Sequence, residues 1–338
     1  MTAPSAPATL HVLLFDRSSR LRMQFTGPKA AESLTGLVTN DVLALRGGDG
    51  VYACALTAKG RIIADVRILA TAAADGTIAS FLVDANAAGG VGFAAMIRKY
   101  VNPRLAKYVD ISVTTSCLTL SGAAAIALLQ SVGADADASG SVAAGHAFTH
   151  RAITIGTTAA TLVRVPDLGD SSTFDLHCER AQADQLMAAL VAAGAVLTAE
   201  TEWHRLRVTA GRPEWGVDMD ESTLAQEANM DALHAISYQK GCYTGQETVA
   251  RVHFRGHVNR TLRLVQFPDG IAPPHGSALL TADDAAVGDS RSTALADAGP
   301  AMGIAMLRRE VADAVSLRWL SDDGGAHVAI VLGGPDDA

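Results

Sequence analysis

Residues 240–251 read KGCYTGQETVAR and set a lysine, a thiol, an aromatic hydroxyl and a carboxylate around two glycines. Gly241 and Gly245 permit a tight backbone, and Lys240 stabilises a thiolate at Cys242 if the two side chains converge. Tyr243 can stack or donate a hydrogen bond. Two alternatives for Cys242 follow: a partly exposed reactive thiolate, or a small buried hydrophobe.

The surrounding chain has the length and composition of a globular protein with two or three domains. Its 338 residues are 49% hydrophobic and can bury a sizeable core. The net charge of −8 argues against general affinity for nucleic acid or acidic membranes, so we expect neither as a direct partner. The N-terminus lacks a basic leader, and the uncharged residues 111–134 carry many Ser and Thr side chains, so we expect a cytoplasmic protein.

Cysteine and histidine spacing predicts neither a disulfide framework nor a metal centre. The four cysteines are widely spaced, with no C-x-x-C and no short Cys/His pairing of the kind that builds zinc or cluster sites. His253 and His257 are four apart, but their surroundings favour a strand, so we interpret them as a solvated pair. The cysteines are Cys54, Cys117, Cys178 and Cys242.

Basic residues concentrate in and just after the opening stretch, although the protein is acidic overall. Between residues 240 and 263 there are five basic side chains and one acid, Glu247. A solvated strand face and a binding place for a small anion both fit this pattern. The basic residues are Lys240, Arg251, Arg255, Arg260 and Arg263.

The order of predicted elements indicates an α+β fold. The runs VYACALT and RIIADVRIL, joined by residues 58–60, predict a hairpin, and short apolar runs from about residue 261 onward predict a small β-barrel or sheet. A strand is expected from about residue 109 to 120, a loop or domain joint at 131–146, and helices over 181–194 and 201–211.

Residues 90–95 match the dinucleotide pattern G-x-G-x-x-A, with Asp110 twenty positions on. Asp110 stands before its strand, whereas a ribose-binding acid belongs at the end of one, and no extended βαβ alternation surrounds the motif. A nucleotide-dependent enzyme built around Gly90 therefore remains only a third alternative.

KGCYTGQE, followed by TVAR, resembles the signature of the YgfZ family of folate-binding proteins, which are relatives of the glycine cleavage aminomethyltransferase in the GcvT-like superfamily. The resemblance extends to LVTNDV at 37–42, TAKGRIIADVRIL at 57–69 and PEWGVDMDESTLAQEANMDA at 213–232. In the last segment the matching positions are Pro213, Gly216, Asp218 and Glu227, with Gln226 replacing a family proline.

The resemblance implies a three-domain ring with mixed sheets, flanking helices and a small C-terminal β-barrel. The expected domains are residues 1–120 with part of 201–256 as a folate-binding domain, 121–200 as a second α+β domain, and 257–338 as the barrel. It also implies tetrahydrofolate, or a one-carbon derivative, in the central opening. We expect the chain to be a monomer.

The family role is support of iron–sulfur cluster synthesis or repair in client enzymes, including radical enzymes that modify tRNA. By resemblance, Cys242, Lys240 and Tyr243 would carry the chemistry. Asp65 would hold the amino-pyrimidine face of folate, unless it only caps the hairpin or forms a salt bridge with Arg67. The other folate-binding candidates are Asp170, Tyr243, Gln246, Glu247, Arg251 and Arg255, with the arginines meeting a polyglutamate tail.

Three positions depart from the aminomethyltransferase pattern. Cys242-Tyr243 stands where those enzymes usually have Asp-Phe, and Ala64-Asp65 replaces a pair of aspartates. Residues 169–173 replace a Gly-Glu-Asp-Gly stretch, whose folate contact would fall to Asp170 here. Glycine cleavage needs the lost groups to orient the folate nitrogen. A folate-dependent aminomethyl or methyl transferase is therefore the alternative function, and whether the protein is an enzyme stays open.

Overall fold

The computed structural model describes residues 11–169, 171–296 and 299–334. The strands of these residues form two sheets and a barrel. The chain divides into two units: one joins the segment through Ser18 to Val113–Glu200, and the other joins Ser19–Ser112 to the residues from Thr201 onward. This mixture of sheets and flanking helices confirms the predicted α+β class. None of the helices in the described ranges is long and apolar enough to cross a membrane.

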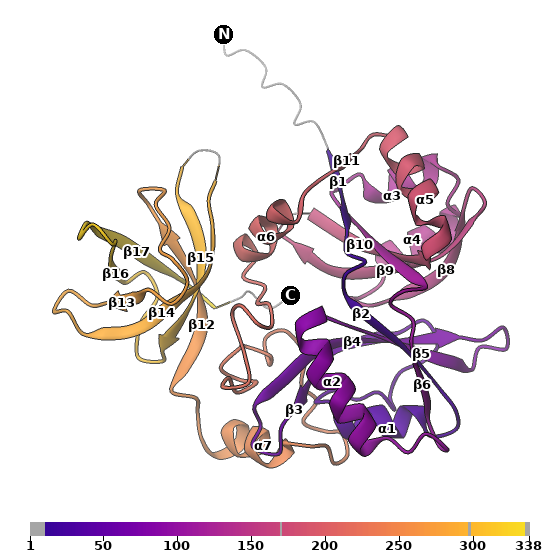
Figure 1. Ribbon diagram of the computed structural model, residues 1–338, viewed down its shortest axis with the longest axis horizontal. Helices are drawn as coiled ribbons and strands as arrows, with labels where there is room; N and C mark the ends of the chain where they lie inside the picture. The colour runs from indigo at the N-terminus through magenta and orange to yellow at the C-terminus, as the bar shows by residue number, and fades with distance from the viewer. Residues whose placement is uncertain (1–10, 170, 297–298, 335–338) are drawn as a thin grey trace, which may run out of the picture. The chain divides into compact units, whose positions relative to one another are not determined.

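The first unit is built on a six-stranded sheet with the order β11-β1-β7-β10-β9-β8. β1 runs parallel to β11, and the other neighbours are antiparallel. Leu129, Val142 and Leu186, one from each of three helices, join the buried cluster of the sheet, and Figure 1 shows these helices on one side of it. The elements are β1 (Val12–Asp16), β7 (Thr115–Ser121), β8 (His150–Ile155), β9 (Thr158–Leu168), β10 (Ser171–Glu179), β11 (Ala195–Leu197), α3 (Ala125–Ser131), α4 (Ala136–Ala144) and α5 (Arg180–Ala192).

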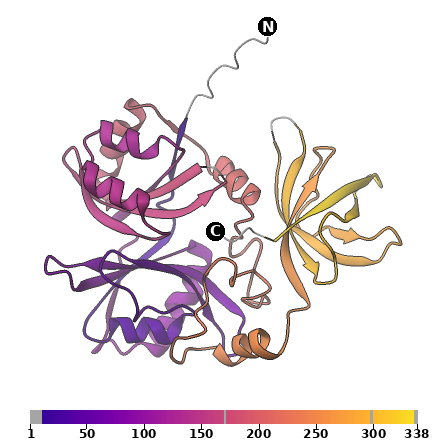
Figure 2. The ribbon, with the colours of Figure 1, turned by 180° about the vertical axis from the view of Figure 1, so that it is seen from behind.

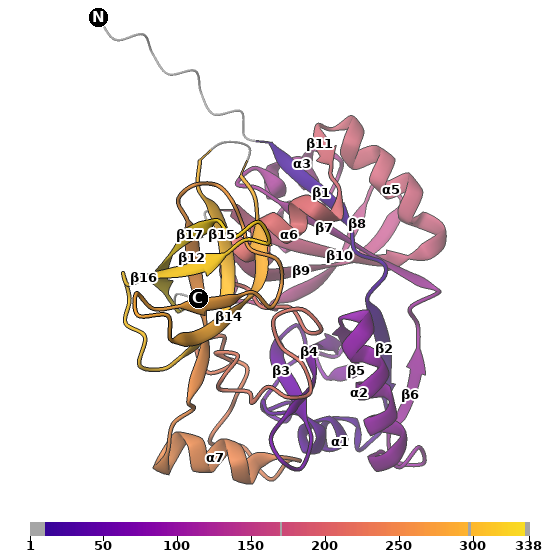
Figure 3. The same ribbon diagram turned by 60° about the vertical axis from the view of Figure 1, so that its left-hand side comes forward.

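The second unit begins with a five-stranded antiparallel sheet of order β3-β4-β5-β2-β6. The hairpin predicted at residues 51–69 is confirmed as β3 and β4, with Gly60 at positive φ in its turn. Helices α1 and α2 cover this sheet (Figure 3) and bury Leu34 and Phe93 against it. The elements are β2 (Leu21–Thr26), α1 (Ala30–Leu37), β3 (Gly50–Leu56), β4 (Ile62–Ala72), β5 (Ile78–Ala85), α2 (Ala87–Tyr100) and β6 (Lys107–Asp110).

The same unit ends in a closed six-stranded barrel, as the sequence predicted. Its strand order is β12-β15-β14-β13-β16-β17, and Trp319 and Phe267 are among the side chains of its apolar interior. Helices α6 (Glu200–Thr209) and α7 (Gln246–Arg255) precede it. The strands are β12 (Arg260–Phe267), β13 (Ala278–Leu280), β14 (Ala286–Ala294), β15 (Ala301–Arg308), β16 (Ser316–Leu320) and β17 (Ala326–Gly333).

Three sequence predictions of local structure are wrong. The single strand expected at 109–120 is two strands, β6 and β7, which belong to different sheets. Residues 131–146 contain helix α4, because Asp135 accepts a hydrogen bond from the Ala138 amide and caps it. The stretch around His253 is helix α7 and not a strand. Val249 is its one buried residue, so the helix places a single apolar contact inward and its other side chains are partly or fully exposed.

The glycines of the motif at 90–95 serve packing. Gly90 lies where an added Cβ would stand 2.8 Å from Leu21 Cδ2, and at Gly92 it would stand 2.7 Å from Ile63 Cγ2. The glycines therefore let helix α2 approach the sheet closely. This close approach accounts for the G-x-G spacing without a nucleotide.

Candidate functional site

Asp65 is a half-buried carboxylate on β4, opposite Cys54 of β3. The Tyr52 hydroxyl donates to Asp65 Oδ2 at 3.0 Å. The other oxygen, Oδ1, is buried and has no hydrogen-bond partner among the residues that the structure describes. Burial raises the pKa of Asp65, whereas Arg20 and the Tyr52 hydroxyl act to lower it. One buried oxygen thus remains available to a ligand.

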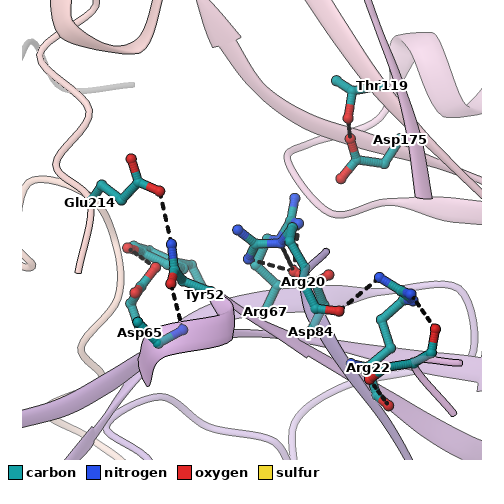
Figure 4. Close-up of polar contacts among 12 residues, drawn as sticks. Arg20, Arg22, Tyr52, Asp65, Arg67, Asp84, Thr119, Asp175 and Glu214 are labelled. Atoms are coloured by element: carbon teal, nitrogen blue, oxygen red, sulfur yellow. Dashed lines mark hydrogen bonds and ion pairs between the residues drawn. The ribbon is translucent and has the colours of Figure 1, made fainter. Parts of the chain in front are cut away.

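Arginines lie next to this carboxylate but pair with a different acid (Figure 4). Arg67 Nε donates to Asp84 Oδ1 at 2.8 Å, and Arg20 Nε donates to the same oxygen at 2.7 Å. Asp84 is 1% exposed, so this is a buried ion-pair cluster. The alternative in which Asp65 serves only as the salt-bridge partner of Arg67 is therefore not what the structure shows.

The loop at 240–245 closes the C-terminal end of helix α1. Lys240 Nζ donates to the carbonyl oxygens of Thr35 and Val38, each at 2.5 Å, and the Thr244 amide donates to Gly36 O at 3.2 Å. The last carbonyls of a helix have no partner within it, so the loop satisfies them. Gly245 has a φ of +87°, and an added Cβ would stand 2.6 Å from Thr57 O. Glycine is required there.

Cys242 is exposed, whereas Cys54, Cys117 and Cys178 are buried. Its neighbour Tyr243 is half-buried, and burial raises the pKa of that hydroxyl to about 12. Lys240 Nζ lies 4.5 Å from the centre of the Tyr243 ring, and burial lowers the pKa of Lys240 to about 8. The lysine is directed at carbonyls and a ring, so it positions the loop that presents the thiol.

Helix α7 carries the other candidates. Gln246 Oε1 accepts a hydrogen bond from the Tyr243 amide at 3.1 Å and so shapes the loop. Glu247, Arg251 and Arg255 are exposed on the helix. His253 and His257 are both exposed, as expected of a solvated pair, and the His253 ring also stacks on Tyr238 with ring centres 3.6 Å apart.

One buried apolar cluster connects these parts. Four half-buried aromatic rings pack against the same cluster, which includes Cys54 and Met230. Tyr52, which binds Asp65, and Tyr243 of the loop at 240–245 therefore pack against the same apolar cluster. Asp170 lies outside the described residues. The four rings belong to Tyr52, Trp215, Tyr238 and Tyr243.

Irregular chain between α6 and α7 runs beside β3 and β4 (Figure 2), and the Ile62 amide donates to Thr223 O at 3.0 Å. Asp218 within it is fully buried and accepts hydrogen bonds from Arg207 Nη1 at 2.7 Å and from the Ser292 amide at 3.0 Å. Glu227 accepts from Arg260 Nε at 3.0 Å. These acids of the 213–232 segment hold the barrel strands β14 and β12, and their role is structural.

Sequence reasoning missed three side chains of this region: Tyr52, Trp215 and Arg20. Tyr52 had a usable signal, because the predicted hairpin pairs Cys54 with Asp65 and sets Tyr52 two residues away on the same face. Trp215 Nε1 reaches Ile62 O at 3.5 Å, and Arg20 stands in a turn before β2. Neither of those two contacts follows from local spacing.

Comparison with known proteins identifies a family and several relatives of this chain. The family model described as "GCVT N-terminal domain" matches residues 7–238. The chain is 29% identical over 273 residues to the tRNA-modifying protein YgfZ of Serratia proteamaculans, covering 80% of this chain and 76% of that protein. It is 28% identical over 272 residues to the mitochondrial iron-sulfur cluster assembly factor IBA57 homolog of Neurospora crassa, covering 80% of this chain and 57% of that one.

A solved structure shares the fold. The glycine cleavage system aminomethyltransferase T from Bartonella henselae superposes with a TM-score of 0.83 at 18% sequence identity, covering 96% of this chain and 86% of that one. The fold class predicted from the sequence is thereby confirmed as GcvT-like, with mixed sheets, helices and the closed C-terminal barrel.

Proposed function

Since the chain belongs to the GCVT N-terminal domain family, we propose that it binds tetrahydrofolate and supports iron–sulfur clusters in client enzymes, including enzymes that modify tRNA. The names of its relatives, a tRNA-modifying protein and an iron-sulfur cluster assembly factor, support this role. We expect the chain to act as a cytoplasmic monomer.

The observation that carries folate binding is the buried Oδ1 of Asp65 without a hydrogen-bond partner among the described residues. A carboxylate of this kind accepts hydrogen bonds from the amino-pyrimidine edge of a pterin, and the Tyr52 hydroxyl holds it in place from the other oxygen. The half-buried rings of Tyr243 and Trp215 provide apolar walls on the shared cluster. The residues present therefore fit the ligand.

The remaining candidates take supporting roles in this proposal. Arg251 and Arg255, both exposed on α7, meet the negative tail of polyglutamylated folate. Lys240 and Gln246 fix the loop, which keeps the Cys242 thiol open to a client protein. Tetrahydrofolate, when bound, supplies ring nitrogens that can carry a one-carbon group.

Calorimetric titration with tetrahydrofolate tests the binding site. Asp65→Asn keeps an acceptor for the Tyr52 hydroxyl but removes the charge, and we expect it to weaken binding by about 1 to 3 kcal/mol. Asp75→Asn, in the exposed turn after β4, is the matched control and should bind as the parent does. Equal affinity of the parent and Asp65→Asn would remove Asp65 from the site.

The client role needs a separate assay. In a strain that lacks its own copy, the gene should restore activity of an iron–sulfur enzyme that modifies tRNA. The transferase alternative predicts turnover with an aminomethyl-loaded lipoyl carrier protein instead. Restored client activity without carrier turnover supports the accessory role, and the opposite result establishes the transferase.

A further inference from the structure

A second group of reactive side chains lies on the six-stranded sheet of the first unit. Cys117 of β7 stands directly opposite His177 of β10, and Asp175 is two residues from His177 on the same face. The thiol sulfur, a carboxylate oxygen and an imidazole nitrogen all lie within 4.8 Å of one another. All three residues are buried, with exposed fractions of 0% to 9%.

These donors are the ligands that zinc uses in proteins. Zinc takes thiolate, imidazole and carboxylate ligands at about 2.0 to 2.3 Å, so two ligands of a tetrahedral ion stand about 3.5 Å apart. The three donor atoms already lie within 4.8 Å of one another, so side-chain adjustment has to bring them only a short way toward that spacing. We propose that Cys117, Asp175 and His177 bind one zinc ion and leave a fourth position for an exogenous ligand.

Thr119 supports the proposed site from outside. Its hydroxyl donates to Asp175 Oδ1 at 2.6 Å, and it stands opposite Asp175 in the strand register (Figure 4). Such a hydrogen bond orients a ligating carboxylate, and outer-shell partners of this kind change metal affinity by about 10- to 100-fold. Strand pairing holds all four residues on a regular sheet, which favours a fixed ligand geometry.

The sheet also offers a matched control. Cys178 follows His177 directly, but its side chain points to the opposite face, into the apolar cluster with Leu176 and Leu118. It is a buried cysteine on the same strand, yet it cannot reach the proposed ion. Sequence spacing does not predict this site, because strand pairing brings together residues that are sixty positions apart in the chain.

Cobalt titration of the chelator-treated full chain tests the proposal. Cys242→Ser serves as the background so that the exposed thiol does not contribute. We expect one equivalent of Co²⁺ to give thiolate charge-transfer absorption that Zn²⁺ abolishes by displacement. Adding Cys117→Ser should remove the band, and adding Cys178→Ala should not. Absence of the band in the background protein, or its persistence after Cys117→Ser, overturns the proposal.

A thermal measurement keeps the test valid if Cys117→Ser does not fold. Zinc that binds the native state raises the unfolding temperature as its concentration rises. We expect this rise in the parent, a 10- to 100-fold higher zinc requirement in Thr119→Val, and no rise in His177→Ala. Equal stabilisation of His177→Ala and the parent by zinc overturns the proposal.

Discussion

Replacing Cys242 by serine separates a chemical thiol from a packing residue. Serine keeps the size and a hydrogen-bonding atom but removes the nucleophilic sulfur. Cys242 is exposed, so its hydroxyl replacement stays hydrated, and we expect a loss of less than about 0.5 kcal/mol in the free energy of unfolding. We expect folate affinity to stay near that of the parent, and client activity to be lost.

Cys54 provides the contrasting case within the same chain. It is 0% exposed and belongs to the cluster beneath Tyr243, so Cys54→Ser buries a hydroxyl at a cost of about 1 to 3 kcal/mol. At about 2 to 4 °C per kcal/mol for units of this size, the unfolding temperature should fall by about 2 to 12 °C. For Cys242→Ser the fall should stay below about 2 °C.

Three measurements decide the outcome. Thermal unfolding compares both variants with the parent, a thiol reagent should modify one cysteine in the native chain and four after unfolding, and complementation reports client activity. Failed complementation by a stable Cys242→Ser protein supports the chemical role. Full complementation by Cys242→Ser refutes the reasoning, as does a destabilisation equal to that of Cys54→Ser.

Three further predictions concern charge. Burial lowers the pKa of Lys240 to about 8 in the folded chain, against 10.5 ordinarily, so between these pH values the unfolded chain binds one more proton than the folded chain. The free energy of unfolding of the parent, relative to that of Lys240→Met, should therefore rise from about pH 8 to 10.5 in urea titrations. A difference that does not change with pH contradicts this. Asp218→Ala leaves Arg207 buried without this acid and should cost about 3 to 5 kcal/mol by the same assay, and a loss below 1 kcal/mol would be inconsistent with that role. Polyglutamylated folate should bind more tightly than the monoglutamate, and this difference in affinity should shrink as salt rises and in the double variant Arg251→Ala/Arg255→Ala. A preference that does not depend on salt would mean that both arginines are only solvated surface residues.

Local pattern was sufficient where contacts are close in sequence. The hairpin of β3 and β4 follows from alternating apolar residues around the turn at Gly60, and it also fixes Cys54 opposite Asp65. The barrel was predictable from short strands separated by turn residues. Both predictions rest on periodicity and turn chemistry, which act over a few residues.

Periodicity and turn chemistry could not predict contacts between residues that are far apart in the sequence. No local signal divides residues 107–121 between two sheets, because the division depends on β2 and β10 as pairing partners. The orientation of Lys240 toward Thr35 and Val38 was likewise unpredictable, since these carbonyls come from a helix two hundred positions earlier. The proposed zinc ligands could not be predicted from sequence spacing for the same reason, since strand pairing brings Cys117 next to His177.

The contact between Lys240 and the end of helix α1 can form only late in synthesis of the chain. Lys240 follows Thr35 by 205 residues, so at about 5 to 20 residues per second the helix waits about 10 to 40 s on the ribosome for its cap. During that interval the nascent N-terminal sheet lacks both the loop and the segment that holds Ile62. A chain that stops before Lys240 leaves the end of helix α1 without these hydrogen bonds, and we expect such fragments to depend on chaperones.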